Sequence, residues 1–421
     1  MPSGKMSGDA QRVRVLYSFA PKLDGLRIGY TAWQQINGVA EAGAEVLACV
    51  GVLRVPVVPE VKVWPTLSWK RLRISYKIVG RLRSYVLHDW IVARRLEKLA
   101  GKVDIIHTWP LGALQTLRIA RRLGIATVLE RPNTHTRFAY EVVQRECDRI
   151  GVPLPPGHEH AYNAAVLERE EIEYDLADKL LCPSDFVLQT FIERGFSREK
   201  LARHSYGFDE KRFYPDGTRT RSRGITVLFA GVCAVRKGLH FALEAWLKSP
   251  AHHDGILLVA GKFIPGYAEK LAPMLSHPSV RVLGHRSDVP ELMRRSDVLV
   301  LPTIEEGSAL VTAEARGSGC VLVVSDAAGA NCKHLENALV HRAGDVETLT
   351  QHLTMLHENR GLLERLRWAS LSTVNEITWT AAGVRLLEVY REVLAANRAE
   401  PRAQVENGGS CEALSAREVR Q

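Results

Sequence analysis

The sequence lacks the long hydrophobic runs and the cysteine patterns that define membrane and secreted proteins. None of its apolar runs is long enough to span a bilayer, and its first residues contain no apolar stretch typical of a signal peptide. Its seven cysteines are scattered, without C-x-x-C pairs or the spacing of metal ligands. We therefore expect a cytoplasmic protein whose thiols are reduced.

Two further absences narrow the class of partner. No predicted strand leads into G-x-G-x-x-G, which disfavours a nicotinamide- or flavin-dependent enzyme. The 56 Lys and Arg residues exceed the 47 Asp and Glu residues, and a net charge of +9 attracts phosphates, anionic lipids or acidic polymers. The aromatic motifs that stack on bases are missing, so no nucleic-acid partner is expected.

Short apolar runs alternate with longer amphipathic ones, which predicts βαβ units and parallel sheets. A stretch rich in glycine, proline and charge separates two such series, so we expect an α/β protein of two Rossmann-like domains facing each other across a cleft. The expected domains are residues 1–205 and 225–377, with a linker at 206–224 and a disordered tail at 397–421. The expected strands lie at 13–19, 46–52, 103–107, 125–130, 179–183, 225–231, 255–261, 279–284, 297–302, 320–325 and 337–341.

A basic segment from Trp64 to Lys98 departs from this alternation. Its spacing predicts a helix, with cations on most faces and no acidic residue before Asp89. One interpretation is a core-packed helix with a solvated basic face. The other is a surface that docks on anionic lipid or on an anionic acceptor. The apolar stripe of this helix is predicted to contain Trp69, Leu72, Tyr76, Val79, Val86 and Trp90.

Two glutamates eight positions apart mark a strand-to-helix turn. Glu306 follows the apolar run 297–302, and Glu314 lies on the helix that Gly307 and Ser308 are expected to open. In an open α/β sheet, ligands bind at the carboxyl ends of the strands, and the start of a helix favours anions. The pair therefore suits a ligand with both hydroxyls and phosphates. The alternative is that both glutamates are solvated surface residues.

A second motif follows another strand of the same predicted sheet. Gly231 ends that strand, and Arg236, Lys237 and Gly238 stand just before the next helix. Backbone N–H groups there already favour anions, arginine can bind phosphate with two parallel hydrogen bonds, and lysine adds a point charge. An Arg-Lys pair alone is common on surfaces. Together with the glutamate turn, it predicts a site for a sugar attached to a diphosphate.

Taken in order, these motifs resemble the nucleotide-sugar-binding half of the GT-B glycosyltransferases, specifically the retaining family 4 (glycosyl transferases group 1). The likeness extends over about residues 13–396, more loosely in the first domain. The resemblance implies the two-domain fold and a helix at 378–396 that crosses back to the first domain. Further matching segments are residues 104–107, 130–136, 178–184, 282–293 and 325–330.

The resemblance also implies roles for individual residues. Arg236 and Lys237 would neutralise the leaving diphosphate, Glu306 would hold hydroxyls of the transferred sugar, and Glu314 would hold the ribose. His135 would face the sugar across the cleft. Other positions expected to contact the donor are Gly231, Gly238, Gly307, Ser308, Ala309, Leu310 and Arg286.

The implied reaction is transfer with retention from a nucleotide-diphosphate sugar to a glycan, lipid-linked or small-molecule acceptor. No protein nucleophile is implied. The resemblance implies neither a metal nor another cofactor, and the sequence contains no Asp-x-Asp motif that would indicate a metal. The basic segment adds the expectation of a cytoplasmic enzyme, peripheral at the inner face of the membrane.

The sequence also departs from the family pattern. Val232 stands where many members have an arginine, and Ser308 and Ala309 replace an aromatic-glycine pair. The Cβ atom of Ala309 narrows the approach of a sugar phosphate to the backbone. These departures keep open an alternative, in which a catalytically impaired GT-B-like protein acts as a binding partner or scaffold in glycan assembly.

Overall fold

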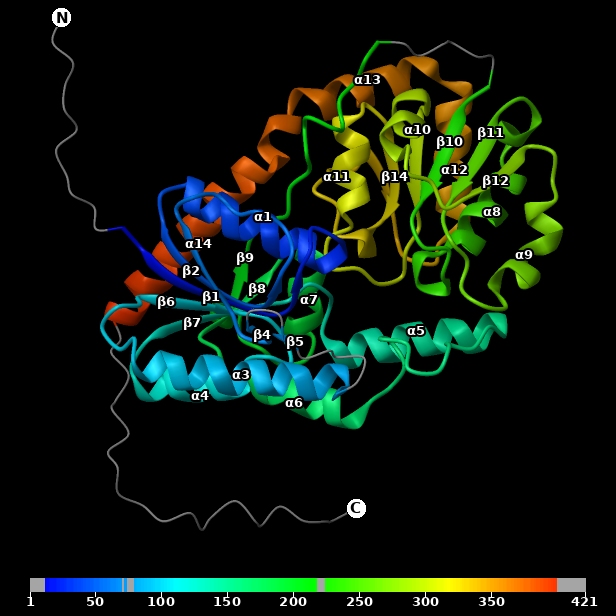
Figure 1. Ribbon diagram of the computed structural model, residues 1–421. Helices are drawn as coiled ribbons and strands as arrows, with labels where there is room; N and C mark the ends of the chain where they lie inside the picture. Colours follow the sequence, from blue (N-terminus) through cyan, green and yellow to red (C-terminus); the bar gives the residue numbers. More distant parts are fainter. Residues whose placement is uncertain (1–11, 70–71, 74–78, 218–223, 400–421) are drawn as a thin grey trace, which may run out of the picture.

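The computed structural model describes residues 12–69, 72–73, 79–217 and 224–399, and these form two α/β domains (Figure 1). Each domain is built on its own parallel sheet, with seven strands in the first and six in the second. Helices cover both faces of each sheet, as the alternating pattern requires. The predicted fold class, two Rossmann-like domains, is confirmed.

The first sheet has the order β3-β2-β1-β6-β7-β8-β9. Its central strands are almost fully buried, because helices lie on both sides of a parallel sheet. The strands are β1 (Arg14–Leu23), β2 (Glu45–Leu53), β3 (Val61–Pro65), β6 (Ile105–Thr108), β7 (Ala126–Glu130), β8 (Lys179–Cys182) and β9 (Leu201–Arg203). The helices are α1 (Arg27–Glu41), α3 (Arg81–Glu97), α4 (Leu114–Arg122), α5 (Thr136–Ile150), α6 (Ala164–Leu176) and α7 (Asp185–Ile192).

The second sheet has the order β12-β11-β10-β13-β14-β15, so the chain changes direction across the sheet between β10 and β13. Ligands of such sheets bind in the crevice at this switch point. The strands are β10 (Thr226–Ala230), β11 (Ile256–Ala260), β12 (Val280–Gly284), β13 (Val298–Leu301), β14 (Val321–Ser325) and β15 (Ala338–His341). The helices are α8 (Leu239–Lys248), α9 (Tyr267–Leu275), α10 (Val289–Arg295), α11 (Leu310–Gly317), α12 (Val346–Glu358) and α13 (Arg360–Ser372).

The chain crosses between the domains twice, and the two crossings lie side by side. Phe208 on the outward crossing forms a parallel bridge with Thr378 on the return. The last helix, α14 (Trp379–Ala399), then lies against α1 on the first domain (Figure 1). Its backbone approaches α1 closely where Gly383 meets Gly38, because neither residue has a side chain. We refer to this paired crossing as the interdomain crossing.

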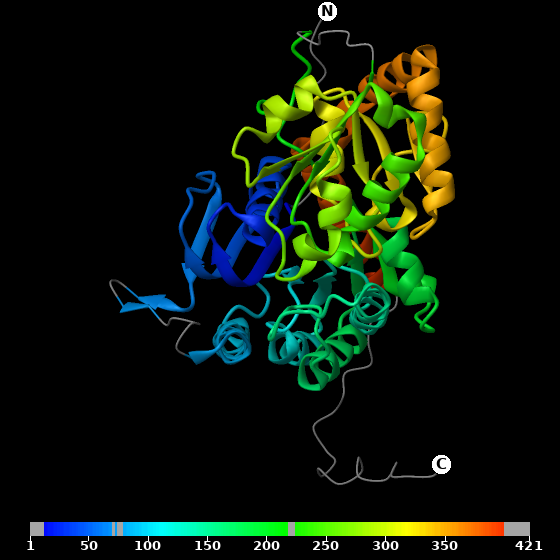
Figure 2. The ribbon, with the colours of Figure 1, turned by 90° about the vertical axis from the view of Figure 1, so that its right-hand side faces the viewer.

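The helix predicted across Trp64–Lys98 is wrong in its first half. Trp64 belongs to β3, and the next described residues form an antiparallel hairpin of β4 (Ser68–Trp69) and β5 (Leu72–Arg73), which projects from the first domain (Figure 2). Lys70, Arg71 and the positions around Tyr76 lie outside the described residues. Trp69 and Leu72 of this hairpin are three positions apart, the spacing that the sequence pattern attributed to a helix.

Helix α3 also buries a different face from the one predicted. Val86 and Trp90 are 38% and 50% exposed, whereas Asp89 is fully buried. The Asp89 carboxylate accepts hydrogen bonds from the backbone N–H groups of Gln115 and Thr116, at the first turn of α4. This polar packing of α3 against α4 leaves two large apolar side chains on the outer surface.

Candidate active site

Arg236 and Lys237 stand at the carboxyl end of β10, on a short 3-10 turn that leads into α8. The turn closes at Gly238, which has φ 72°, and a Cβ atom there would lie 1.9 Å from the carbonyl oxygen of Pro302. Only glycine fits this position. The Arg-Lys turn is therefore packed directly against the end of β13.

The loop after β13 is tied to this turn by hydrogen bonds to the backbone of Arg236. Ile304 N–H and Thr303 Oγ1 both donate to the carbonyl oxygen of Arg236, at 2.9 and 2.7 Å. Since β10 and β13 are the strands on either side of the switch point, these bonds bring the two predicted motifs together. Glu306 follows within the same loop.

Two cations and two carboxylates form one cluster there. Arg236 Nη1 donates to Glu306 Oε1 at 2.6 Å and to Glu305 Oε2 at 3.1 Å, and Lys237 Nζ pairs with Glu306. Burial alone raises the pKa of Glu306, but the charges of Arg236 and Lys237 outweigh it and hold that pKa below its ordinary value. Burial lowers the pKa of Lys237, and Glu306 opposes this effect. The cluster is nearly neutral as a whole.

Glu305 was not predicted, although it is the most buried member of the cluster, with no exposed surface. Its carboxylate also reaches the first domain, where it accepts hydrogen bonds from Thr134 N–H at 3.1 Å and from Thr134 Oγ1 at 2.7 Å. His160 Nε2 lies 3.2 Å from its other oxygen. The signal in the sequence was the pair of consecutive acids directly after a buried strand.

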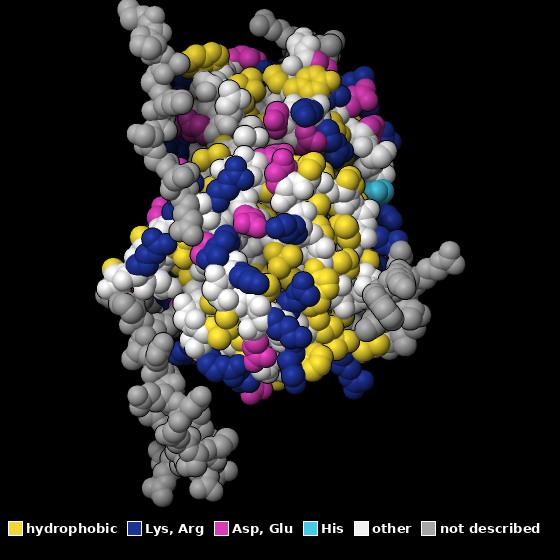
Figure 3. Space-filling model, turned by 60° about the vertical axis from the view of Figure 1, so that its left-hand side comes forward, with side chains coloured by type: hydrophobic (Ala, Val, Ile, Leu, Met, Phe, Trp, Pro, Cys, Tyr) yellow, Lys and Arg dark blue, Asp and Glu magenta, His cyan; other side chains and the backbone are white. Residues whose placement is uncertain are grey.

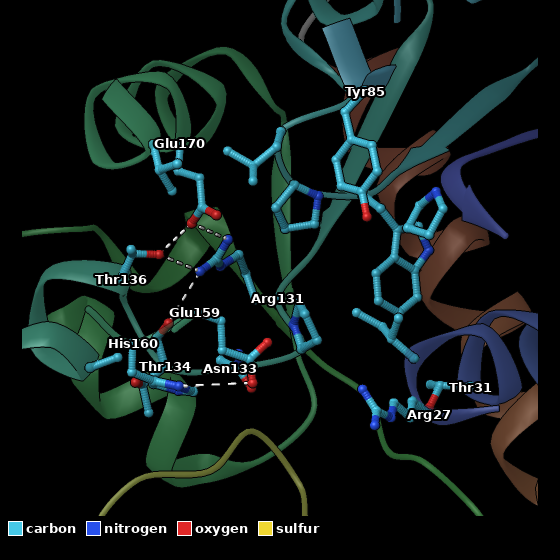
Figure 4. Close-up of a pocket in the computed structure, with 18 of the residues that line it drawn as sticks. Arg27, Thr31, Tyr85, Arg131, Asn133, Thr134, Thr136, Glu159, His160 and Glu170 are labelled. Carbon is cyan, nitrogen blue, oxygen red and sulfur yellow. Dashed lines mark hydrogen bonds and ion pairs between the residues drawn. The ribbon is translucent and has the colours of Figure 1, made fainter. Parts of the chain in front are cut away.

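A cavity of about 510 Å³ opens beside this cluster, mostly within the first domain (Figure 4). Ser308 and Leu310 border it from the glutamate turn of the second domain. Arg131 in its wall is already occupied, because it donates to Glu170 and to the carbonyl oxygen of Thr134. Other residues of the wall are Arg27, Thr31, Arg81, Tyr85, Trp109, Glu159 and His160.

Arg27 and Arg81 differ from Arg131 in their surroundings. Both are exposed at the cavity, Arg27 on α1 and Arg81 on α3. Neither has an ion-pair partner within residues 12–69, 72–73, 79–217 and 224–399. The cavity therefore presents two cations that are available to an anionic ligand, and neither was singled out for this site from the sequence.

Glu314 lies on α11 beside the interdomain linker. Burial raises its pKa to about 7, an effect that Arg212 of the linker opposes and Asp209 reinforces. Its charge also acts on the Tyr30 hydroxyl of α1, which accepts a hydrogen bond from the Trp379 indole at 3.1 Å. This carboxyl group thus lies near the interdomain crossing, with charged or polar residues of the linker and of the first domain around it.

The remaining donor positions predicted on the second domain lie near the cluster, except for Arg286. Gly307 packs against the first domain, and a Cβ atom there would lie 1.7 Å from the carbonyl oxygen of Pro132. Ala309 is buried, and its N–H donates to the carbonyl oxygen of Ala328 at 3.1 Å. Gly231 ends β10 with φ 146° and is exposed at the same sheet edge. Arg286 lies apart, on the exposed loop after β12, and pairs with Asp288.

The structure does not place His135 across the cleft as expected. Its ring packs among Tyr174, Phe191 and Phe196, and its Nδ1 accepts the N–H of Arg137 as the cap of α5. It borders a separate hollow and does not line the main cavity, although its neighbours Thr134 and Thr136 do. Burial lowers its pKa to about 3, so the ring is neutral. A strand-end histidine that caps the following helix explains the sequence pattern without a role at the sugar.

Two other features concern metals and membranes. Among the described residues, no group of three or more His, Cys, Asp or Glu side chains is arranged to hold a metal ion. None of the described helices is both long and apolar enough to cross a bilayer.

Comparison with known proteins shows which proteins this architecture resembles. Residues 224–359 match the family model described as glycosyl transferases group 1. Among solved structures, sucrose-phosphate synthase from Thermosynechococcus elongatus aligns with a TM-score of 0.65 at 16% identity, over 92% of this chain and 100% of that one. HepE from Anabaena in complex with UDP aligns with a TM-score of 0.61 at 14% identity, over 91% and 100%. WaaG, a glycosyltransferase involved in lipopolysaccharide biosynthesis, aligns with a TM-score of 0.59 at 15% identity, over 90% of this chain and 99% of that one.

Two curated relatives match shorter stretches. UDP-Gal:alpha-D-GlcNAc-diphosphoundecaprenol alpha-1,3-galactosyltransferase of Escherichia coli is 31% identical over 83 residues, 19% of this chain and 21% of the relative. N,N'-diacetylbacillosaminyl-diphospho-undecaprenol alpha-1,3-N-acetylgalactosaminyltransferase of Campylobacter jejuni is 28% identical over 123 residues, 28% and 32% of the two chains. The chain thus matches about a fifth and a third of these relatives. The predicted resemblance to GT-B glycosyltransferases is confirmed: the second domain matches the model of glycosyl transferases group 1, and the fold of the whole chain matches these solved structures.

The raised pKa of Glu314 predicts a pH-dependent stability. The folded state holds the proton of this carboxyl group up to about pH 7, whereas an ordinary glutamate loses it near 4.5. Because the folded state binds more protons in this window, this group makes the protein less stable as the pH rises from about 4.5 to 7. Glu314→Gln should therefore be more stable than the wild type at pH 8 by about 1–3 kcal/mol, with no gain at pH 4.

Urea denaturation of both proteins at several pH values measures this difference. Glu358→Gln, at the exposed end of α12, is the matched control and should show a constant difference from the wild type. A Glu314→Gln difference that does not change between pH 4 and 8 would contradict the assignment.

Proposed function

We propose that the protein is a retaining glycosyltransferase that moves a sugar from a nucleoside-diphosphate sugar to a lipid-linked glycan. The observation that carries this proposal is the cluster of Arg236, Lys237 and Glu306 at the switch point of the second sheet. It combines cations for a diphosphate with a carboxylate for sugar hydroxyls. The family match over the same domain supports it.

The chemistry at this cluster is positioning and charge stabilisation. Negative charge grows on the diphosphate as its bond to the sugar breaks, and Arg236 and Lys237 stabilise it there. Glu306, now sharing its cations with the phosphates, accepts hydrogen bonds from the sugar, and Glu314 accepts those of the ribose. The leaving phosphate oxygen takes the acceptor proton, so neither a protein nucleophile nor a metal is part of this mechanism.

The acceptor enters the cavity of the first domain in this proposal. Both curated relatives are named for transfer to a glycan on a diphosphoundecaprenol carrier. A carrier of this kind brings a diphosphate of its own, and Arg27 and Arg81 are the exposed cations at the cavity. They would bind the acceptor phosphates, while Arg236 and Lys237 bind those of the donor.

The same domain offers a surface to an anionic membrane. Figure 3 shows Lys and Arg side chains gathered over the lower half of one face, which belongs to the first domain, with hydrophobic side chains beside them. On α3, the exposed Trp90 and Val86 lie among exposed arginines such as Arg83 and Arg94. Each cation near an anionic surface adds about 1 kcal/mol of binding free energy. We propose a cytoplasmic enzyme that associates with the membrane through this face.

Nucleotide release from a panel of UDP- and GDP-sugars tests the donor site. Glu306→Ala should lower the rate of release about 100-fold or more, because it removes a group that holds the reacting sugar.

Arg236→Ala should weaken the binding of the nucleoside diphosphate by about 1.5–3 kcal/mol through the loss of charged hydrogen bonds. Arg342→Ala, an exposed arginine elsewhere on the second domain, is the control and should match the wild type.

The outcome separates the two readings of the sequence. A wild type that neither binds nor releases nucleotide would contradict the enzyme. Nucleotide binding without turnover, over a broad range of acceptors, would favour the scaffold instead.

The acceptor proposal predicts a difference between two acceptors. Arg27→Ala and Arg81→Ala should each raise the KM for a short-chain lipid-diphosphate glycan about tenfold, the effect of losing one charged hydrogen bond. The KM for the same glycan without its diphosphate should not change. Arg118→Ala, exposed on α4, is the control. Equal effects on both acceptors would remove the phosphate-binding role.

A further inference from the structure

Glu305 is a buried carboxylate at which three parts of the molecule meet. It extends from the loop after β13, accepts two hydrogen bonds from Thr134 of the first domain, and lies within hydrogen-bonding distance of His160. On its own domain it accepts a hydrogen bond from Arg236 Nη1 at 3.1 Å. Burial alone raises its pKa, but the His160 hydrogen bond and the Arg236 charge outweigh this and hold the carboxyl ionised. It is therefore a charged bridge between the domains.

The bonds of Arg236 are unevenly distributed over its guanidinium group. Nη1 donates to the Glu305 carboxylate, to the Glu305 carbonyl oxygen at 2.7 Å, and to Glu306. Among the described residues, no partner binds Nε or Nη2. An arginine binds phosphate best through two adjacent N–H groups. Glu305 thus binds the Nη1 atom of the guanidinium group. The opposite edge, formed by Nε and Nη2, is available to a diphosphate.

This arrangement depends on the first domain. An ionised carboxylate without exposed surface is costly unless hydrogen bonds satisfy it, and three of the contacts of Glu305 come from Thr134 and His160. If the domains separate, water must replace these contacts and the carboxylate is no longer held in place. The close packing of Gly307 on Pro132 shows that the same loop forms the domain contact.

We propose that Glu305 is a positioning residue that couples domain closure to the orientation of Arg236. In the closed arrangement, Thr134 and His160 hold the Glu305 carboxylate, which in turn holds the guanidinium with its Nε–Nη2 edge toward the donor diphosphate. When the domains open, this constraint is lost and Arg236 binds the leaving diphosphate less tightly. The proposal rests on the proposed donor site. It adds that Glu305 orients Arg236 in this site when the domains close.

A double-mutant cycle tests the coupling. Glu305→Gln has nearly the same shape but puts an amide N–H₂ against the Arg236 guanidinium. By calorimetry with UDP or GDP, whichever the wild type binds, we expect it to weaken binding about tenfold. In an Arg236→Ala background, the same substitution should change affinity less than twofold, because the group that it positions is gone. Equal losses in both backgrounds would overturn the proposal.

A second pair of variants tests the role of the first domain without altering the donor site. Thr134→Val removes the Oγ1 donor but keeps the size of the side chain, whereas Thr134→Ser keeps the donor. Thr134→Val should lower kcat about tenfold, and Thr134→Ser less than twofold, with similar thermal unfolding midpoints for both. A purely structural role would lower the unfolding midpoint of Thr134→Val without lowering kcat, and that result would overturn the coupling.

The two proposals fail in different ways. A wild type that binds neither UDP nor GDP overturns the proposed function and this inference with it. A wild type that binds one of them, with variants that behave additively, overturns only the role of Glu305.

Discussion

The ion cluster around Arg236 is the interaction on which the rest of the site depends. It joins the loops after β10 and β13, which belong to the two strands at the switch point of the second sheet. Through Glu305 it also joins the second domain to Thr134 of the first. One guanidinium group therefore links the local fold of the donor domain to the position of the other domain.

The ion pairs of this cluster stabilise the charges of its members. Two partly buried cations without partners would repel each other and lose hydration, so Glu305 and Glu306 stabilise them. In the proposed donor site, a diphosphate would share these cations with the carboxylates and bind at the Nε–Nη2 edge of Arg236. Under this proposal, nucleotide binding and domain closure depend on the same charged groups.

Much of the fold could be predicted from the sequence, because buried parallel strands are apolar runs that patterning identifies directly. The short edge strands β3 and β9 and the β4–β5 hairpin were missed, since strands of two to five residues carry no clear period. In the site, Arg236, Lys237 and Glu306 come together as predicted positions on adjacent strands. The two consecutive acids marked Glu305 but not its partners in the first domain. Those partners and the location of His135 depend on packing between segments far apart in the chain, which the sequence pattern does not show.

The central claim is that this cluster binds the diphosphate of a nucleotide sugar between the domains. A crystal structure of the protein with a bound nucleoside diphosphate tests it most directly. We predict phosphate oxygens within hydrogen-bonding distance of Arg236 Nε or Nη2 and of Lys237 Nζ, with the ribose hydroxyls at Glu314. A nucleotide bound elsewhere, with the Arg236 cluster unchanged and no phosphate near it, would contradict the account.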